Sequence, residues 1–409
     1  MDRPLAGVVV LDLTRFLSGP HSTLLLAGLG AEVIKIDDPA GGDPTAGAPP
    51  LAGPRGVALE RVTPQDYGLA YLKRARCKKS ATLNLKHPEG RGLFLDLASH
   101  ADVVIENFRP GVAERLGIAY EALAARNPRI VYCALTGYGA TGPDRDLKAY
   151  DLMAQAASGL MAITGSPEGP PTKAGTPLSD MIAGTYAALG VVAALHERNR
   201  SGRGQAIDVS MVDCLFSMIM DEPLDCYAAL GLAPRQGNRI MRFSPFNTYR
   251  SADGWVAIGA ATPQEWRGLA LALGRQDLLE DPRFQSVGWR IAHNEEVDAI
   301  VGDWTRARST AGIVETLKQH DVPCSPVRTP EEAIAWPHLR ARGMVEPLRQ
   351  PDGTASPATA AGLPIRFSRS PAALDAPAPV PGAHTREVLS RFLGLDEPAL
   401  EDLQARGVI

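Results

Sequence analysis

Short apolar runs alternate with helical patterns along the first 140 residues of the chain. An apolar run at 7–13 precedes the turn TRFLSGP, the helical segment HSTLLLAGLG and a second apolar run, AEVIKID. Similar runs recur at 101–108 and 129–139, with helical patterns between them. This alternation predicts an α/β fold, with a Rossmann-like, doubly wound parallel sheet and ligand sites at the carboxyl ends of its strands.

The pattern changes in the second half of the chain. A helical run at 211–232 leads away from the first region, and strand-like runs flank the turn Ala252–Gly254, which predicts an antiparallel hairpin. Helical segments around 266–273, 293–306 and 310–320 complete a smaller α+β domain, and Pro- and Ala-rich sequence at 351–381 predicts an irregular return before two short helices. The predicted organisation is a large domain beginning at 1–210, a linker helix at 211–232, a small domain at 233–330 and a return at 331–409.

Composition narrows the classes of partner. With 409 residues the chain exceeds the usual size of one hydrophobic core, and its net charge of -4 provides no overall attraction for nucleic acid or a membrane surface. Five scattered cysteines without CxxC or Cys/His ligand spacing predict a reduced, cytoplasmic protein without a metal site. The longest apolar run, at 181–195, contains Gly and Thr and is short for a bilayer, so it predicts a core helix.

The turn after the first strand argues against a nicotinamide cofactor. It contains Gly19 and Pro20 but no GxGxxG motif. Asp37 ends the second strand, where dinucleotide-binding folds often place a ribose-binding acid, although an acidic residue there is common by chance.

Cationic and polar side chains gather where predicted strands end. Five cations lie between Lys73 and Lys79, ahead of a strand that ends at Lys86, while Asn107 and Arg109 end the next strand and Arg115 follows. Such a basic segment is either a solvated face or the binding site of a phosphate-bearing ligand.

The stretch 148–180 contains carboxylates at both ends and loop-forming Gly and Pro between them. Asp180 stands where a loop becomes an apolar helix, so backbone N–H groups and the helix dipole are expected to favour its ionised form. This pattern fits either a helix cap or an anionic nucleophile or base at the edge of a cleft.

Several blocks of sequence, taken together and in order, carry a resemblance to a known family: PLAGVVVLDLTRFLSGP, LGAEVIKID, LNLKHPEG, DVVIENFRPGVAERLG, LTGYGATGP, AYDLMAQAASGLMAITG and PLSDMIAG. They resemble the class III coenzyme A transferases of the CaiB/BaiF type, a family that includes formyl-CoA transferase, carnitine CoA-transferase and α-methylacyl-CoA racemases. The resemblance implies a large CoA-binding domain built from both ends of the chain, an inserted small domain, and an interlocked homodimer.

The resemblance also assigns roles to individual residues. Asp180 matches the family's nucleophilic aspartate. Tyr150 stands where the racemase branch has a histidine base, and Thr262 stands where that branch has a glutamate base. Because a phenol with a pKa of about 10 and a threonine hydroxyl are poor bases, this combination favours a transferase over a racemase.

Coenzyme A contacts carried over from the family fall on residues near the predicted strand ends and around Tyr150: Leu17, Ser18, Leu83, Asn84, Leu85, Lys86, Asn107, Phe108, Arg109, Arg115, Lys148, Ala149, Tyr150 and Asp151. An arginine of formyl-CoA transferase corresponds to Asp38 here, so the basic segment 73–79 is expected to supply the missing phosphate charge. Asp151 is expected to cap the helix that follows it.

The implied activity is transfer of CoA from an acyl-CoA, of the succinyl-CoA type, to a small carboxylic acid through aspartyl anhydride and aspartyl-CoA intermediates. The segment GNRIMRFSPFN lacks the glycine run with which formyl-CoA transferase covers oxalate, and the pattern is closer to transferases that act on dicarboxylates. Arg239 and Arg242 are candidates for holding the second carboxylate. An acyl-CoA racemase and a non-catalytic CoA-binding protein are the alternatives.

Overall fold

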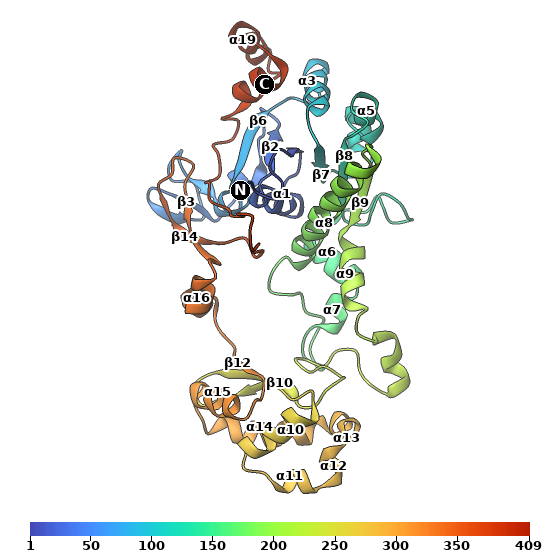
Figure 1. Cartoon of the computed structure of the whole chain (residues 1–409), viewed down its shortest axis with the longest axis vertical. Coiled ribbons are helices and arrows are strands. Elements are labelled where there is room, and N and C mark those ends of the chain that lie inside the picture. The colour runs from blue at the N-terminus through green and yellow to red at the C-terminus, as the bar shows by residue number, and fades with distance from the viewer. The chain divides into compact units, whose positions relative to one another are not determined.

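A six-stranded parallel sheet organises the larger part of the chain in the computed structural model, which describes residues 1–409 (Figure 1). Its strands are β1 (Val9–Asp12), β2 (Glu32–Asp37), β6 (Lys78–Thr82), β7 (Val103–Glu106), β8 (Val131–Thr136) and β9 (Ala206–Ser210). Across the sheet they run β6-β2-β1-β7-β8-β9, and every neighbouring pair is parallel. Counted along the chain, this is the 3-2-1-4-5-6 order of a Rossmann fold, and it confirms the predicted α/β class.

Helices cover both faces of this sheet. One face packs against α1 (Ser18–Gly28), α8 (Leu178–Ser201) and α9 (Met211–Ile219), and α6 (Asp151–Ala157) adds Ala154 to the same core. The other face packs against α3 (Pro88–Ser99), α4 (Val112–Leu116), α5 (Tyr120–Arg126), α18 (Thr385–Leu393) and α19 (Glu397–Ala405). The C-terminal helices α18 and α19 therefore complete the hydrophobic core on this face of the sheet, to which the N-terminal strands β1 and β2 also contribute.

The long helix α8 lies close to α1 and beside β8 and β9 (Figure 1). Small residues permit this approach, because a Cβ at Gly184 would lie 2.4 Å from the Ser18 carbonyl oxygen. By length and composition α8 is apolar enough to cross a membrane. Its Ala183, Ala187 and Val191 are fully buried in the core beneath the sheet, in agreement with the predicted core helix.

Two smaller sheets belong to the same large unit, which comprises Met1–Leu160, Ala174–Asp221 and Pro337–Ile409. They are formed by β3 (Leu51–Gly53), β4 (Gly56–Ala58) and β5 (Tyr67–Gly68), and by β13 (Val345–Arg349) and β14 (Ala355–Ala361); η1 (Pro44–Ala46), α2 (Leu69–Arg74) and α17 (Pro337–Ala341) complete the unit. The return at 351–381 was predicted to be irregular throughout, but β14 pairs with β13 and buries Ala360 against α2.

The small unit comprises Met161–Lys173 and Glu222–Trp336. Its sheet has the order β10 (Phe246–Arg250), β11 (Trp255–Gly259), β12 (Cys324–Pro326), and the antiparallel β10–β11 pair is the predicted hairpin. Its helices are α10 (Pro263–Ala272), α11 (Asp277–Glu280), α12 (Pro282–Gln285), α13 (Val287–Ala292), α14 (Asn294–Arg306), α15 (Thr310–Gln319) and α16 (Pro330–Ala335). The short α7 (Leu160–Ile163) lies at a boundary between the units.

The helix predicted over 211–232 is wrong in its length. Helix α9 ends at Ile219, and a separate 3-10 helix, η2 (Leu224–Leu230), follows. Pro223 lies between them; it has no backbone N–H and disfavours helical backbone at the residue before it, so one continuous helix cannot form. The boundaries also differ at 161–173, which the structure groups with the small unit.

Candidate functional site

Strands β1 and β7 are neighbours in space, and the loops that follow them leave the sheet in opposite directions along the strand order. In parallel α/β sheets this switch point forms a crevice at the carboxyl ends of the strands. Asn107 joins the two loops, because its Oδ1 accepts from the Arg15 amide at 2.9 Å and its Nδ2 donates to the Arg15 carbonyl at 2.8 Å. The crevice is therefore held by a two-way amide bridge.

A cavity of about 390 Å³ opens at this crevice and contains Asp180. Its lining residues come from the end of β8, from the loops after β1, β7 and β8, and from α1, α8 and α9: Phe16, Ser18, Asn107, Phe108, Arg109, Pro110, Leu135, Thr136, Gly137, Arg145, Leu147, Lys148, Ala149, Tyr150, Asp180 and Met211. Seven of the predicted CoA contacts are among them. The Tyr150 ring is well exposed and stands edge-on to the Phe16 ring, with 6.4 Å between the ring centroids.

Asp151 fixes the start of the helix that carries Asp180. Its carboxylate accepts from the Ser179 amide and the Ser179 hydroxyl, both at 2.8 Å, and from the Gln155 amide group at 2.7 Å. The prediction that Asp151 caps its own helix is wrong: α6 has Tyr150 at its N-cap, and the Asp151 side chain instead binds the first turn of α8. Asp151 is thus a positioning residue for Asp180.

Asp180 is the third residue of α8, and burial and neighbouring charged groups act on its carboxylate in addition to the helix N-terminus. Burial and then the nearby Asp151 carboxylate raise the pKa of Asp180 to about 6, against hydrogen bonds from Ser18 and the charge of Arg74, which lower it. The expectation that the helix start favours the ionised form is therefore corrected, since desolvation outweighs the backbone amides. Asp180 is still ionised at neutral pH, and its raised basicity suits a nucleophile.

A second cavity of about 220 Å³ lies at the ends of β1, β2 and β6. It is lined by Leu13, Arg15, Ile36, Asp37, Asp38, Leu83, Leu85, Lys86, Phe108, Val112 and Leu116, so it contains three of the predicted CoA contacts that are distant from Asp180. Phe108 lines both cavities. Lys86 lies 3.8 Å from Asp38, which opposes its positive charge.

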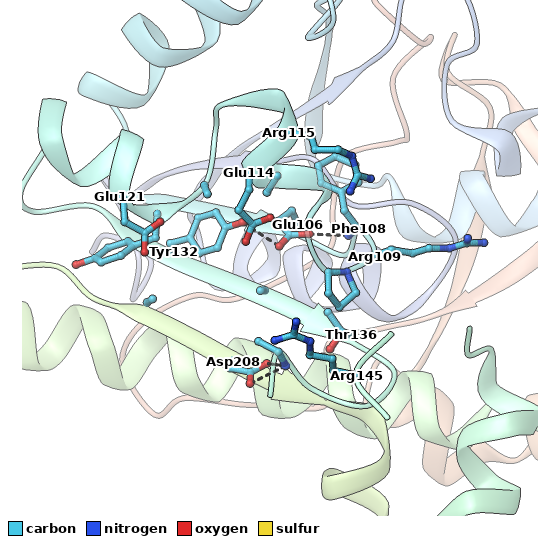
Figure 2. Close-up of a pocket in the computed structure, with 18 of the residues that line it drawn as sticks. Glu106, Phe108, Arg109, Glu114, Arg115, Glu121, Tyr132, Thr136, Arg145 and Asp208 are labelled. Atoms are coloured by element: carbon cyan, nitrogen blue, oxygen red, sulfur yellow. Dashed lines mark hydrogen bonds between the residues drawn. The ribbon is translucent and has the colours of Figure 1, made fainter. Parts of the chain in front are cut away.

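A third cavity, of about 670 Å³, shares Phe108 and Arg109 with the first and also contains the predicted Arg115 (Figure 2). Glu106 lies within it, accepting from the Phe108 amide at 2.6 Å and from the Tyr132 hydroxyl at 2.9 Å. Burial raises the pKa of Glu106 to about 7 despite these hydrogen bonds. Figure 2 shows Arg145 and Asp208 on the opposite side of this cavity.

Three of the predicted CoA contacts line none of these three cavities: Leu17, Asn84 and Asp151. Leu17 occupies the N-cap position of α1, and Asn84 donates to the Gly407 carbonyl at 3.3 Å while accepting from the Lys86 amide at 3.1 Å. Asn84 thereby ties the loop after β6 to the end of the chain.

Three of the five cations in the basic segment 73–79, which was expected to supply phosphate charge, are paired with carboxylates of the protein. Arg76 pairs with Glu346 at 3.1 Å, Lys78 pairs with Asp12 at 3.0 Å, and Lys79 pairs with carboxylates of β2 and α18. The Lys78 side chain is fully buried, and its charge neutralises the buried Asp12 carboxylate. Strand β6 begins at Lys78, and successive side chains of a strand point to opposite faces of the sheet. The neighbouring cations Lys78 and Lys79 therefore lie in different protein environments, which a count of charges along the sequence does not show.

Asp37 is likewise occupied by a protein partner, because it lies 3.0 Å from the buried Lys35 amine. In the small unit, Arg239 pairs with Asp298 at 2.7 Å and Arg242 pairs with Glu222 at 2.6 Å. Thr262 caps α10 in a capping box with Glu265. Each of these side chains therefore has a structural contact of its own.

Sequence reasoning missed several residues of the Asp180 cavity, notably Phe16, Thr136, Arg145 and Met211. Thr136 ends β8, so its place at the carboxyl end of a strand was a usable signal. Met211 starts α9 and Arg145 lies in a loop, and neither position follows from periodicity. The described chain contains no cluster of three or more potential metal ligands.

Comparisons with known proteins agree with this geometry. Residues 5–385 match the sequence pattern described as CoA-transferase family III. The chain is 37% identical to a succinyl-CoA–D-citramalate CoA-transferase of Chloroflexus aurantiacus over 100% of this chain and 98% of the relative, and 35% identical to a succinate–glutarate CoA-transferase of Agrobacterium fabrum over 97% of each. A crystal structure of a CAIB/BAIF family protein from Brucella suis superposes with a TM-score of 0.81 at 32% identity, covering 96% of this chain and 100% of that one. A Rossmann-type sheet, an aspartate in the cavity at its switch point and a family match along nearly the whole chain lead to one conclusion: the chain belongs to CoA-transferase family III.

Proposed function

We propose that this enzyme transfers CoA from succinyl-CoA to a small dicarboxylic acid. The observation that carries the proposal is the position of Asp180, a half-buried carboxylate in a cavity at the switch point of a family III fold. Relatives that match along the chain support the substrate class: besides the two transferases above, they include a human succinyl-CoA:glutarate CoA-transferase at 31% identity over 100% of this chain.

In the proposed reaction, an Asp180 oxygen attacks the thioester carbonyl of the donor. The C–S bond breaks, which gives CoA thiolate and a mixed anhydride between Asp180 and the donor acid. The thiolate then attacks the Asp180 carbonyl carbon, which releases the donor carboxylate and leaves an aspartyl-CoA thioester. The acceptor carboxylate repeats these two steps in reverse, so acceptor-CoA leaves and the Asp180 carboxylate is restored.

The two cavities that share Phe108 suggest a path for CoA. We propose that the nucleotide end occupies the cavity lined by Leu83, Leu85 and Lys86, and that the thiol end passes Phe108 to reach Asp180. This assignment accounts for ten of the predicted contacts with one extended ligand. Tyr150, at the mouth of the Asp180 cavity, would orient the thioester through its hydroxyl group.

A homodimer is also proposed, and the large unit supports it with exposed apolar side chains. These lie on α6, α8 and α9: Leu152, Met153, Met181, Tyr186, Leu189, Phe216 and Met218. An apolar surface of this extent on neighbouring elements fits burial by a second copy of the chain. The interlocked arrangement and the cytoplasmic location stay predictions from the sequence.

The function is tested by assaying CoA transfer from succinyl-CoA to a panel of carboxylic acids by mass spectrometry. We expect acyl-CoA products from dicarboxylates and none with the Asp180→Asn variant. An acyl-CoA racemase would instead exchange the α-proton of a 2-methylacyl-CoA for deuterium without any acceptor acid, and a purely CoA-binding protein would do neither.

A further inference from the structure

Arg74 is a cation near the Asp180 cavity that the proposed reaction does not use, and the sequence singled it out only as one member of the basic segment 73–79. It is the last residue of α2, and its guanidinium donates a hydrogen bond to the Phe16 carbonyl oxygen. Phe16 and Asp180 line the same cavity. Arg74 itself is not among the residues that line this cavity, and it contacts the cavity wall through the Phe16 carbonyl.

The Phe16 backbone has an unusual conformation at this contact. Its φ angle is 67°, in the left-handed region that bulky residues rarely adopt. Such a conformation persists only where surrounding contacts maintain it, and it is concentrated at ligand sites. The hydrogen bond from Arg74 is one such contact, and the Phe16 ring stands edge-on to Tyr150 on the cavity side.

Arg74 and the exposed Lys73 differ from the other cations of this segment, because no carboxylate lies within ion-pair distance of either. Arg76, Lys78 and Lys79 each have such a partner. The carboxylates that attract Arg74 from farther away are Asp180 and Asp43, and Asp43 is already paired with Lys35 at 3.0 Å. A guanidinium has five N–H donors, so most of them remain for an oxygen ligand.

We propose that Arg74 determines the specificity of the enzyme by binding the carboxylate of the substrate that does not react. The inference rests on the proposed function and names the residue that selects dicarboxylates. A guanidinium pairs with a carboxylate through two parallel hydrogen bonds, which gives strength and geometric selectivity. No ion pair joins Arg74 to Asp180, so Arg74 leaves the nucleophile free to attack.

This assignment also explains how a site with a buried nucleophilic carboxylate can admit a doubly charged acid. Asp180 and Asp151 together repel an incoming dianion. A cation beside the cavity offsets that repulsion, and it does so only for acids long enough to reach it. Monocarboxylates gain no comparable contact.

The test uses succinyl-CoA as the donor and compares acceptors that differ only in the distal carboxylate, in the wild-type enzyme and in Arg74→Gln and Arg74→Lys. The pairs are glutarate with pentanoate, and isotopically labelled succinate with butyrate. We expect Arg74→Gln to raise KM for the dicarboxylates by roughly tenfold to a hundredfold, as for a lost charge-assisted hydrogen bond, with little change in KM for the monocarboxylates. Arg74→Lys should restore part of the preference. Arg55→Gln, which makes the same charge change at an exposed turn between β3 and β4, should change neither value.

The measured quantity is the ratio of kcat/KM between paired acids within one variant, which does not depend on the fraction of enzyme that is folded. An equal loss for both classes of acid would show that Arg74 only maintains the Phe16 loop or Asp180, and unchanged values would show that it has no role; either result overturns the inference. Failure of the wild-type enzyme to transfer CoA to any acid would instead overturn the proposed function. Transfer to dicarboxylates by the wild-type enzyme, with an unchanged preference between paired acids in Arg74→Gln, would overturn the inference alone.

Discussion

Asp12 and Asp180 lie in the same large unit but in opposite electrostatic surroundings. Asp12, at the end of β1, is fully buried and accepts from Lys78 at 3.0 Å, from the Thr23 hydroxyl at 2.6 Å, and from the Thr14 amide at 2.9 Å. Burial alone would raise the pKa of Asp12, but Lys78, Lys35 and the hydroxyl groups lower it. For Asp180 the balance is reversed, and its pKa rises to about 6.

The two carboxylates differ in the number of hydrogen-bond donors and cations that contact them. A buried charge with a complete set of donors is stable and unreactive, whereas one with few donors retains basicity and costs folding free energy. Asp12 therefore has a structural role in the sheet, whereas Asp180 has the reactive role. Each of the following predictions changes one side of this comparison.

The largest effect is expected for Asp180→Asn. The amide preserves the size of the side chain but removes the nucleophilic oxygen, so transfer should fall at least about a thousandfold. Initial rates of acceptor-CoA formation measure the loss. Retention of more than a tenth of the activity would show that another group attacks the thioester.

Lys78→Met should instead damage the fold. It leaves the Asp12 carboxylate buried without its cation, and breaking such a pair costs about 3–5 kcal/mol of unfolding free energy. Denaturant unfolding measures the change. The neighbouring Lys79→Met is the control, because Lys79 is partly exposed and its ion pairs contribute about 1 kcal/mol or less. Equal effects of the two variants would contradict the assignment of Lys78 to the core.

The pH dependence of transfer should follow Asp180. Because its pKa is about 6 and only the ionised form attacks, kcat/KM is expected to decrease about tenfold for each pH unit below that value. A pH–rate profile between pH 4.5 and 8 measures this limb. A profile that stays flat down to about pH 4.5 would mean that Asp180 lacks the raised pKa.

The smallest effect concerns stability. The pKa of Asp180 is raised in the folded state from 3.8, so the folded protein binds the extra proton and loses stability as the pH rises from about 4 to about 6. Asp180→Asn removes this cost and should stabilise the protein at pH 7 by about 1–2 kcal/mol. Thermal unfolding should show the gain at pH 7 and almost none near pH 4. A loss of stability at pH 7 would contradict the electrostatic account.

The sheet, the hairpin and the principal helices could be predicted because periodicity records which faces are buried. The length of the helix after Met211 could not be predicted by periodicity alone, since the chain stays apolar past the break at Pro223. Resemblance to the family located Asp180, and strand ends indicated where Asn107 and Arg109 would lie. The strand predicted to end at Lys86 ends at Thr82 instead, so Lys86 lies in the loop that follows it. Contacts between residues far apart in the sequence, such as Arg76 with Glu346, decide which cations remain unpaired. A count of charges along the sequence does not reveal these contacts.

The same reason explains why Arg74 was hidden within the basic segment. Its neighbours at 76, 78 and 79 satisfy carboxylates on β13, β1, β2 and α18, and only the folded chain separates these structural cations from the one near the nucleophile. Asp151 was misplaced for a related reason. Its position at the start of α6 fits a local cap, but two of the donors that reach its carboxylate belong to Ser179, 28 residues later.

Chemical trapping at Asp180 tests the central claim most directly. The enzyme is incubated with succinyl-CoA and then with hydroxylamine or borohydride, and the modified peptide is mapped by mass spectrometry, with Asp180→Asn treated in parallel. The account predicts a hydroxamate or a reduced side chain at residue 180 of the wild-type enzyme and no modification of that peptide in the variant. Turnover of succinyl-CoA with an acceptor acid, but with no trapped adduct at Asp180 or with the adduct on another residue, would contradict it.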